Sequence, residues 1–287
     1  MSQPQPSVNA LTPAQVEEAV DSAAEKKVAT PFLRLLVSAM FAGAFIGFGA
    51  LFFTVVTSDS SLSFAAAKLL GGLAFCLGLV LVLCCGSELF TGNSLMVSGA
   101  MEHRIGWGAM LGNWAVVWIG NLLGALLAVA LVSAAHILDL NAGAAGTTAI
   151  AVAAAKISPS WLTLFFRGIL CNIFVCLAVR IGFAARSVAD KVLGILLPIS
   201  AFVACGFEHC VANMFFLPMG LVAKLTGYAL PSGADASVVN VTGILYNISA
   251  ATLGNIVGGA IFVGLAYWFV QGHHADRGIF GKGGANA

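Results

Sequence analysis

Charge is what this sequence lacks most. Only 9% of its 287 residues are Asp, Glu, Lys or Arg, whereas 60% are hydrophobic; ordinary globular domains carry about 25% charged residues. So few charges cannot cover the surface of a soluble enzyme, and the chain is far too apolar to be disordered. The formal net charge of +1 provides no basic field for nucleic acid. The class that remains is an integral membrane protein.

Apolar runs of bilayer-spanning length are abundant. We predict six spans, which cover residues 32–57, 65–83, 105–136, 161–183, 192–221 and 244–270. Short polar stretches interrupt the second span after residue 85 and the fifth span after residue 205. Lys and Arg are more frequent in the segments on the side of the N-terminus, which predicts that both termini are cytoplasmic.

The two ends of the chain differ from the apolar middle. Residues 1–30 predict a cytoplasmic amphipathic helix, with a capping box at Thr12 and Gln15 and apolar residues at helical spacing from Val16. Such a helix is either an anchor on the membrane surface or a mobile gate. Residues 31–272 form the expected six-helix channel domain, and residues 273–287 are expected to be a cytoplasmic tail.

An internal repeat relates the two halves. Residues 85–93 and 205–213 share the pattern C-G-x-E-x4-N, and residues 113–124 and 247–258 share N-x6-G-N-x2-G. No comparable match links the first and fourth spans. Because each half would have three spans, the second half would cross the membrane in the opposite direction, as an inverted repeat with helix breaks at corresponding places.

Broken helices in a membrane favour an anion site. Each break frees backbone N–H groups, and the half-helix that follows starts with partial positive charge. Inverted symmetry would aim both starts at the middle of the membrane, where a small anion can bind and leave again. Glu88 and Glu208 lie in the breaks, where the carboxylates can accept bonds from the freed N–H groups. We expect them, with Asn93 and Asn213, to stabilise the breaks.

Three further polar residues are candidates for the pore. His209 follows the fifth-span break, and its imidazole can donate to an anion or pass a proton, the alternative being a buried structural histidine. Asn172 lies within the fourth span, where it can bond across helices or line a path. Lys156 precedes that span on the predicted outer side, where it would attract anions.

Rival functions have weaker support. Cys210 and His209 could form a thiol–base pair, but adjacent helical residues point about 100° apart, so we expect no enzyme. An aquaporin-type channel for neutral solutes predicts Asn-Pro-Ala at both breaks, and neither break contains proline. All seven cysteines lie in apolar stretches, and no cofactor, metal or nucleic acid is expected. A receptor or scaffold without flux has no feature in its favour.

Three segments resemble the formate/nitrite transporter family. Gly86–Gly92 resembles the loop of its broken second helix, Gly168–Ala178 its fourth-helix signature, and Phe207–Met214 the break in its fifth helix. The resemblance extends from about Phe32 to Trp268. It implies an all-α, aquaporin-like fold of six transmembrane helices, assembled in the bilayer as a homopentamer with one pore per protomer, in the cell inner membrane.

The resemblance also implies roles for individual residues. His209 would face Thr91 at the centre of the pore with Asn172 nearby, and Lys156 would be the vestibule lysine. The family's inner and outer constrictions fall on six positions: Leu79, Leu89, Phe90 and Val175 inside, Phe75 and Phe202 outside. The N-terminal helix corresponds to a segment linked to pH-dependent gating.

Substrate is predicted by the same resemblance. Phe215–Gly220 is similar to the formate-channel branch, whereas Gly86–Gly92 is also similar to the nitrite branch, and the hydrosulfide branch is similar around His209. Formate is therefore the first expectation, nitrite the second, and hydrosulfide a further alternative.

Overall fold

The computed structural model describes residues 9–271, in which all regular structure is helical. Its first half contains α1 (Pro13–Val28), α2 (Phe32–Val56), α3 (Phe64–Cys85), α4 (Phe90–Asn93), η1 (Ser94–Met96), α5 (Val97–Met101) and α6 (Trp107–Ala134). After η2 (Ile137–Asp139) follow α7 (Ala144–Ile157), α8 (Trp161–Ala184), α9 (Val188–Ala204) and α10 (Cys210–Leu225). The chain ends with η3 (Ala236–Val238), α11 (Val241–Ile256), the π-helical η4 (Val257–Leu265) and α12 (Ala266–Gln271). The predicted tail, residues 273–287, lies outside the described residues.

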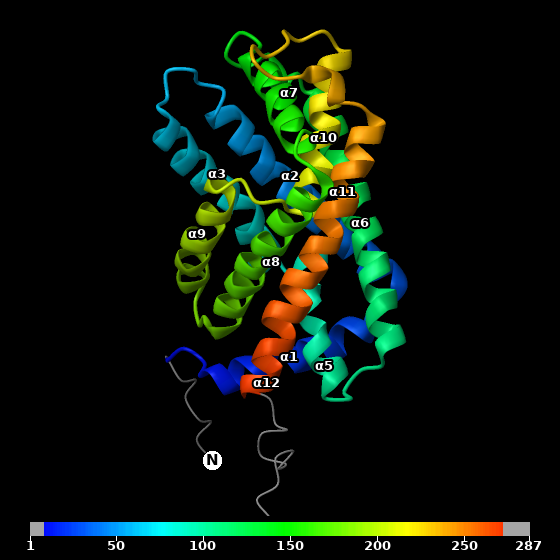
Figure 1. The fold of residues 1–287 in the computed structure, drawn as a ribbon. Coiled ribbons are helices and arrows are strands. Elements are labelled where there is room, and N and C mark those ends of the chain that lie inside the picture. Colours follow the sequence, from blue (N-terminus) through cyan, green and yellow to red (C-terminus); the bar gives the residue numbers. More distant parts are fainter. Residues whose placement is uncertain (1–8, 272–287) are drawn as a thin grey trace, which may run out of the picture.

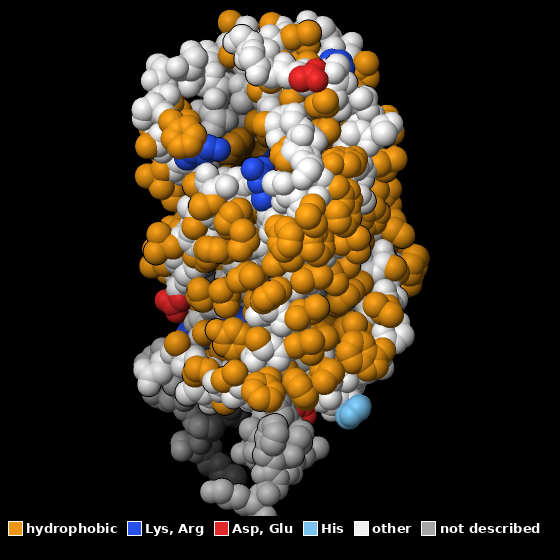
Figure 2. Space-filling model, in the orientation of Figure 1, with side chains coloured by type: hydrophobic (Ala, Val, Ile, Leu, Met, Phe, Trp, Pro, Cys, Tyr) orange, Lys and Arg blue, Asp and Glu red, His pale blue; other side chains and the backbone are white. Residues whose placement is uncertain are grey.

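Five helices are long and apolar enough to cross a membrane: α2, α3, α6, α8 and the continuous helix from α11 to α12. They form one elongated bundle, with α7 at one end and α1 and α12 at the other (Figure 1). Apolar side chains cover most of the bundle's flank in Figure 2. Phe41, Leu127 and Leu197 are examples that are at least half exposed on the isolated chain. This surface is that of an integral membrane protein.

Two helices stop and restart at equivalent places. α3 ends at Cys85, and the chain is non-helical until α4 begins at Phe90; α9 ends at Ala204, and α10 begins at Cys210. Gly86 and Gly206 lie at the two turns with φ of +75° and +70°. A side chain would be strained at such a positive φ, so glycine is required at both positions.

The halves also pack alike. α2 packs against α3 and α6, while α8 packs against α9 and α11. A Cβ atom on Gly124 would lie 1.8 Å from the Met40 carbonyl oxygen, and one on Gly258 would lie 2.2 Å from the Ile169 carbonyl oxygen. These two glycines therefore let the helix pairs α2–α6 and α8–η4 approach backbone to backbone.

α1 lies against the bundle rather than apart from it. The capping box is present, since the Gln15 N–H donates to Thr12 and the Thr12 N–H donates to Gln15. Its buried face includes two acids as well as Val16 and Val20. Glu17 accepts from Arg180 of α8 at 2.6 Å and from Ser98 of α5 at 2.6 Å. α1 is thus held by buried polar contacts to two other elements.

α7 is a helix that the sequence analysis did not predict. It lies at the opposite end of the bundle from α1 and packs against α10. Its run of alanines is favourable for a helix, but at 14 residues it is too short to cross a membrane. Below, the two ends of the bundle are called the α7 end and the α1 end.

Candidate pore

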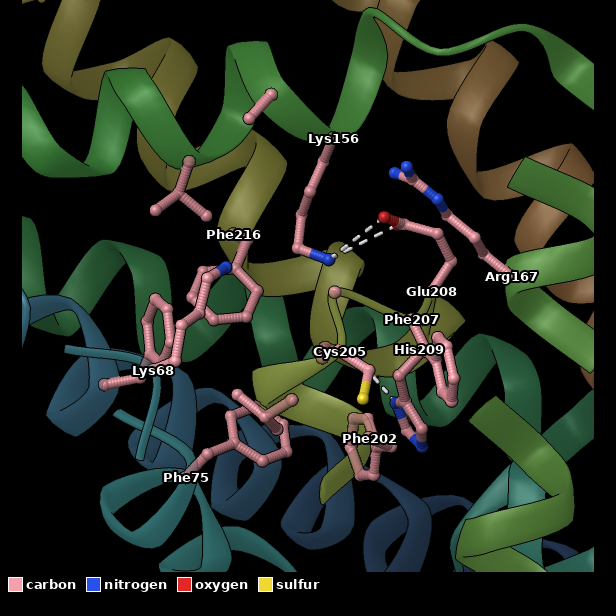
Figure 3. A pocket seen from close by; sticks show the side chains of 16 residues that line it. Lys68, Phe75, Lys156, Arg167, Phe202, Cys205, Phe207, Glu208, His209 and Phe216 are labelled. Atoms are coloured by element: carbon pink, nitrogen blue, oxygen red, sulfur yellow. Dashed lines mark hydrogen bonds and ion pairs between the residues drawn. The ribbon is translucent and has the colours of Figure 1, made fainter. Parts of the chain in front are cut away.

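A cavity of about 310 Å³ opens at the α7 end. We call it the vestibule. Side chains from α3, α7, α8 and the break before α10 reach into it (Figure 3). Its charged lining residues are Lys68, Lys156, Arg167 and Glu208, and its aromatic ones include Phe75, Phe202 and Phe216. His209 lies at its inner limit.

His209 is fixed at the start of α10. It is the N-cap residue, only 2% exposed, and its Nδ1 accepts from the Ala212 N–H at 3.0 Å. With Nδ1 occupied as an acceptor, the neutral ring carries its proton on Nε2. Nε2 lies 2.9 Å from Thr91 Oγ1 on α4. The ring can therefore donate one hydrogen bond from Nε2, toward Thr91 or toward a bound anion.

Asn172 supports this pair from α8. Its Nδ2 donates to the Thr91 carbonyl at 3.2 Å and to the Asn255 carbonyl at 2.7 Å. The side chain is fully buried. These contacts tie the backbone beside Thr91 to α8 and α11, so Asn172 positions the threonine in this structure.

Below the vestibule the lumen is narrow and apolar. Ile46, Phe75, Leu79, Leu89, Val175, Ile199, Phe202 and His209 surround a space of only about 10 Å³. Five of the six predicted constriction residues are in this set. The sixth, Phe90, is buried beside Trp114, with ring centroids 6.3 Å apart. A void this small is at the lower limit for one water molecule, so a hydrated ion does not fit.

A second cavity, of about 80 Å³, lies toward the α1 end. Leu79 and Leu89 line both it and the narrow space, and Lys27 of α1 is its charged lining residue. Phe75, Phe202 and His209 are likewise shared between the narrow space and the vestibule. The three spaces therefore form one series through the protomer, with His209 in the middle part.

The break before α10 is held by a polar network around Glu208. Glu208 contacts Lys156 Nζ at 3.3 Å and accepts from Asn213 at 2.6 Å and Asn247 at 3.1 Å. Asn255 Nδ2 donates to the carbonyls of Glu208 and Gly168, each at 2.8 Å. The carboxylate is thus buried but well compensated. Its donors are side-chain amides and an ammonium, not the freed backbone N–H groups that the sequence analysis expects.

The break before α4 has a similar network. Glu88 contacts Lys27 Nζ at 2.6 Å and accepts from Asn93 at 2.8 Å. Asn121 Nδ2 donates to the carbonyls of Glu88 at 2.9 Å and Ala39 at 2.7 Å. Each amide therefore has a counterpart in the other half.

Lys27 and Asn121 are residues whose importance the sequence analysis missed. Lys27 stands twelve residues before Ala39, just as Lys156 stands twelve residues before Gly168. α1 and α7 thus supply equivalent lysines, each paired with the glutamate of its own half. The shared spacing was the one signal in the sequence that Lys27 is equivalent to Lys156, because α1 and α7 share no other obvious sequence pattern.

The family's sequence pattern, described as formate/nitrite transporter, matches residues 14–269. The chain belongs to the formate/nitrite transporter family. It is 37% identical over 277 residues to the formate channel FocA of Escherichia coli (strain K12), covering 93% of this chain and 96% of that protein. It is 33% identical over 239 residues to the nitrite transporter NirC of the same strain, covering 81% of this chain and 82% of that protein.

A solved structure of a family member has the same fold. The structure named "Pentameric formate channel with formate bound" superimposes with a TM-score of 0.74 at 39% sequence identity, and covers 83% of this chain and 97% of that chain. The formate/nitrite transporter relatives are channels and transporters, not enzymes.

Proposed function

We propose that this chain is a channel for small monovalent anions and that formate is its main substrate. The observation that carries the proposal is the position of the buried His209–Thr91 pair, 2.9 Å apart, between a cationic vestibule and an apolar constriction. The 37% identity to a formate channel supports formate over other small anions.

The proposed fold has six spans in an inverted repeat. α9 and α10 together supply the span that is missing from the five long helices, with its interruption at residues 205–209. α3 and α4 form the equivalent interrupted pair. The matching networks around Glu88 and Glu208 support this symmetry, and the Lys and Arg distribution supports cytoplasmic termini in the cell inner membrane.

We further propose a homopentamer with one pore in each protomer. The name of the solved relative describes a pentamer, and this chain covers 97% of it. The large apolar side chains exposed on α2, α3 and α6 would contact neighbouring protomers and lipid. The series of cavities lies within a single protomer, so no pore residue has to come from a neighbour.

In the proposed mechanism His209 compensates the anion where water is lost. Burying an unpaired charge in an apolar space costs many kcal/mol, and the constriction strips hydration from whatever passes. The Nε2–H of His209 would turn from Thr91 to the anion, and the Thr91 hydroxyl would then donate as well. In this conformation Nδ1 faces the Ala212 N–H, so the ring donates a hydrogen bond and holds no second proton to release.

The direct test is formate flux into proteoliposomes. His209→Phe removes the donor but keeps an aromatic ring, and Thr91→Ala removes only the hydroxyl. We expect both variants to lose most of the flux, whereas His136→Phe, on an exposed residue in the loop after α6, keeps it. Gel filtration of each variant checks folding. Unchanged flux in a well-folded His209→Phe variant would exclude the role of the histidine.

Nitrite is the second candidate substrate, supported by the 33% identity to a nitrite transporter. Hydrosulfide is a further alternative from the likeness around His209. Fluxes of formate, nitrite and hydrosulfide measured side by side, each over a range of pH, rank the three. Osmotic water permeability of the same vesicles tests the alternative of a channel for neutral solutes. We expect this water permeability to be negligible.

A further inference from the structure

The two ends of the pore differ in charge although their polar networks match. Three cations and one carboxylate line the vestibule at the α7 end, which leaves a formal excess of two positive charges beside the neutral His209. At the α1 end, Lys27 is the charged residue that lines the cavity, and its Nζ is paired with Glu88 at 2.6 Å. Among the residues that line the two cavities, the larger positive excess is therefore at the α7 end.

Lys156 is not the source of this excess. Its ammonium lies 3.3 Å from the Glu208 carboxylate, which compensates its charge. Lys68 and Arg167 make no ion pair within residues 9–271. The contact of Lys68 is the Phe64 ring, whose centroid is 5.6 Å from Nζ. Both side chains are partly exposed, and they approach the cavity from opposite sides (Figure 3).

Neither cation has a counterpart at the α1 end. The Arg167 carbonyl accepts from the Glu208 N–H as the Ser38 carbonyl accepts from the Glu88 N–H, so Ser38 is the residue equivalent to Arg167. Lys68 stands twenty residues before Glu88, and Val188 stands twenty residues before Glu208. The repeated framework is thus similar at both ends, and among the residues that line the two cavities the cations without an ion pair are at the α7 end.

We propose that Arg167 and Lys68 form an anion-capture site at the α7 mouth, ahead of Lys156 and His209. The ligand class is small planar carboxylates and related oxyanions, because a guanidinium presents two parallel N–H donors that match two oxygens of one anion. Lys68 adds a second positive charge across the cavity. The site makes capture from the α7 side more effective than capture from the α1 side. As a step in transport, this inference rests on the proposed function.

Cys205 allows a test that needs no transport. It lines the same vestibule and is exposed. The test uses full-length protein with Cys84→Ser and Cys85→Ser, which remove the other exposed thiols. In this protein we compare the rates at which Cys205 reacts with anionic and with cationic methanethiosulfonates. One charge at about 8 Å in water changes each rate by about 2.4-fold, in opposite directions, so Arg167→Ala should lower the anionic-to-cationic ratio about fivefold to sixfold.

Controls separate capture from general charge loss. Arg34→Ala removes the same charge from a residue that lines neither cavity, and the ratio should not change. Arg167→Lys keeps the charge and should keep the ratio. A ratio that is the same in Arg167→Ala and in the parent protein would overturn the proposal, whatever the protein transports.

Formate kinetics then test the ligand class. At low ionic strength we expect Arg167→Ala and Lys68→Gln to raise the apparent KM about fivefold with the maximal flux unchanged, and about 0.5 M salt to remove the difference. Arg167→Lys should raise KM less than Arg167→Ala, because the charge remains and the paired donors do not. Equal KM values in parent protein and Arg167→Ala would overturn capture, whereas absence of formate flux in the parent would overturn the proposed substrate and leave the labelling result standing.

Discussion

Asp21 should make the docking of α1 depend on pH. Its carboxyl is fully buried, and neither oxygen has a hydrogen-bond partner within residues 9–271. The nearby Ser98 hydroxyl donates to Glu17 instead, at 2.6 Å. Burial raises the pKa of Asp21 from 3.8 to about 6. The nearby Ser98 hydroxyl and, to a smaller degree, Arg104 oppose the rise, and the negative charge of Glu17 adds to it. The docked helix therefore favours the protonated, neutral carboxyl.

The sign and size of the effect follow from linkage. Docking raises the pKa, so the contribution of Asp21 is fully present below about pH 4 and is lost as the pH rises through 6. A shift of about two units corresponds to about 3 kcal/mol, or about a hundredfold in the docking equilibrium. Above pH 6 the free-energy cost of burying the ionised Asp21 carboxylate has to be offset by the remaining contacts of α1. One of these is the ion pair of Glu17 with Arg180 at 2.6 Å.

Amide hydrogen exchange of Pro13–Val28 measures this equilibrium. After correction for the intrinsic pH dependence of exchange, the protection of wild-type α1 should fall up to about a hundredfold between pH 4 and pH 7. Asp21→Asn keeps the shape of the side chain and cannot ionise, so its protection should be nearly constant. Glu25→Gln removes an exposed carboxylate from the same helix and should retain the wild-type profile.

Two results would refute this reasoning. Protection of wild-type α1 that increases with pH would show that the sign is wrong. Protection that falls equally in wild type and Asp21→Asn would show that another group is responsible.

Three more outcomes are expected. Gly124→Ala should destabilise the protein by about 1–3 kcal/mol or more, because the added Cβ would lie 1.8 Å from the Met40 carbonyl oxygen. The loss is measured as a lower Tm in detergent. Gly112→Ala on the same helix, with open space around it, is the control and should leave the Tm unchanged. Arg180→Ala should cost about 3–5 kcal/mol by leaving Glu17 buried without its cation, and adding Glu17→Gln should recover part of the lost Tm. Asn255→Leu should also lower Tm, by leaving two carbonyls and the Cys210 N–H without their buried partner.

Hydropathy predicted the long helices well because it reports directly on lipid contact. The fourth predicted span, 161–183, is nearly identical to α8, Trp161–Ala184. α7 was missed because a helix of 14 residues carries no spanning signal. The short helices after Phe90 were also hard to predict, since their polar sequence resembles a loop and tertiary contacts hold them.

The candidate site was predicted in part from residue chemistry and in part from resemblance. Glu208 and Asn213 stand out as polar residues in an apolar chain, and the structure places them in contact. The proximity of Thr91 to His209 joins positions 118 residues apart, which no local pattern encodes. The sequence offered only the shared twelve-residue spacing as a signal for Lys27, because its pairing with Glu88 depends on how α1 folds back against the bundle.

The polar contacts within each helix break and the contacts that join the two halves differ in when they can form during synthesis. The network of the first break lies entirely within residues 27–121, and that of the second lies within residues 156–255. The first half can therefore satisfy its interrupted backbone in the bilayer before the second half leaves the ribosome. The contacts of Thr91 with His209 and Asn172, in contrast, join the halves. The His209–Thr91 contact thus requires both halves, whereas each break requires only the residues of its own half.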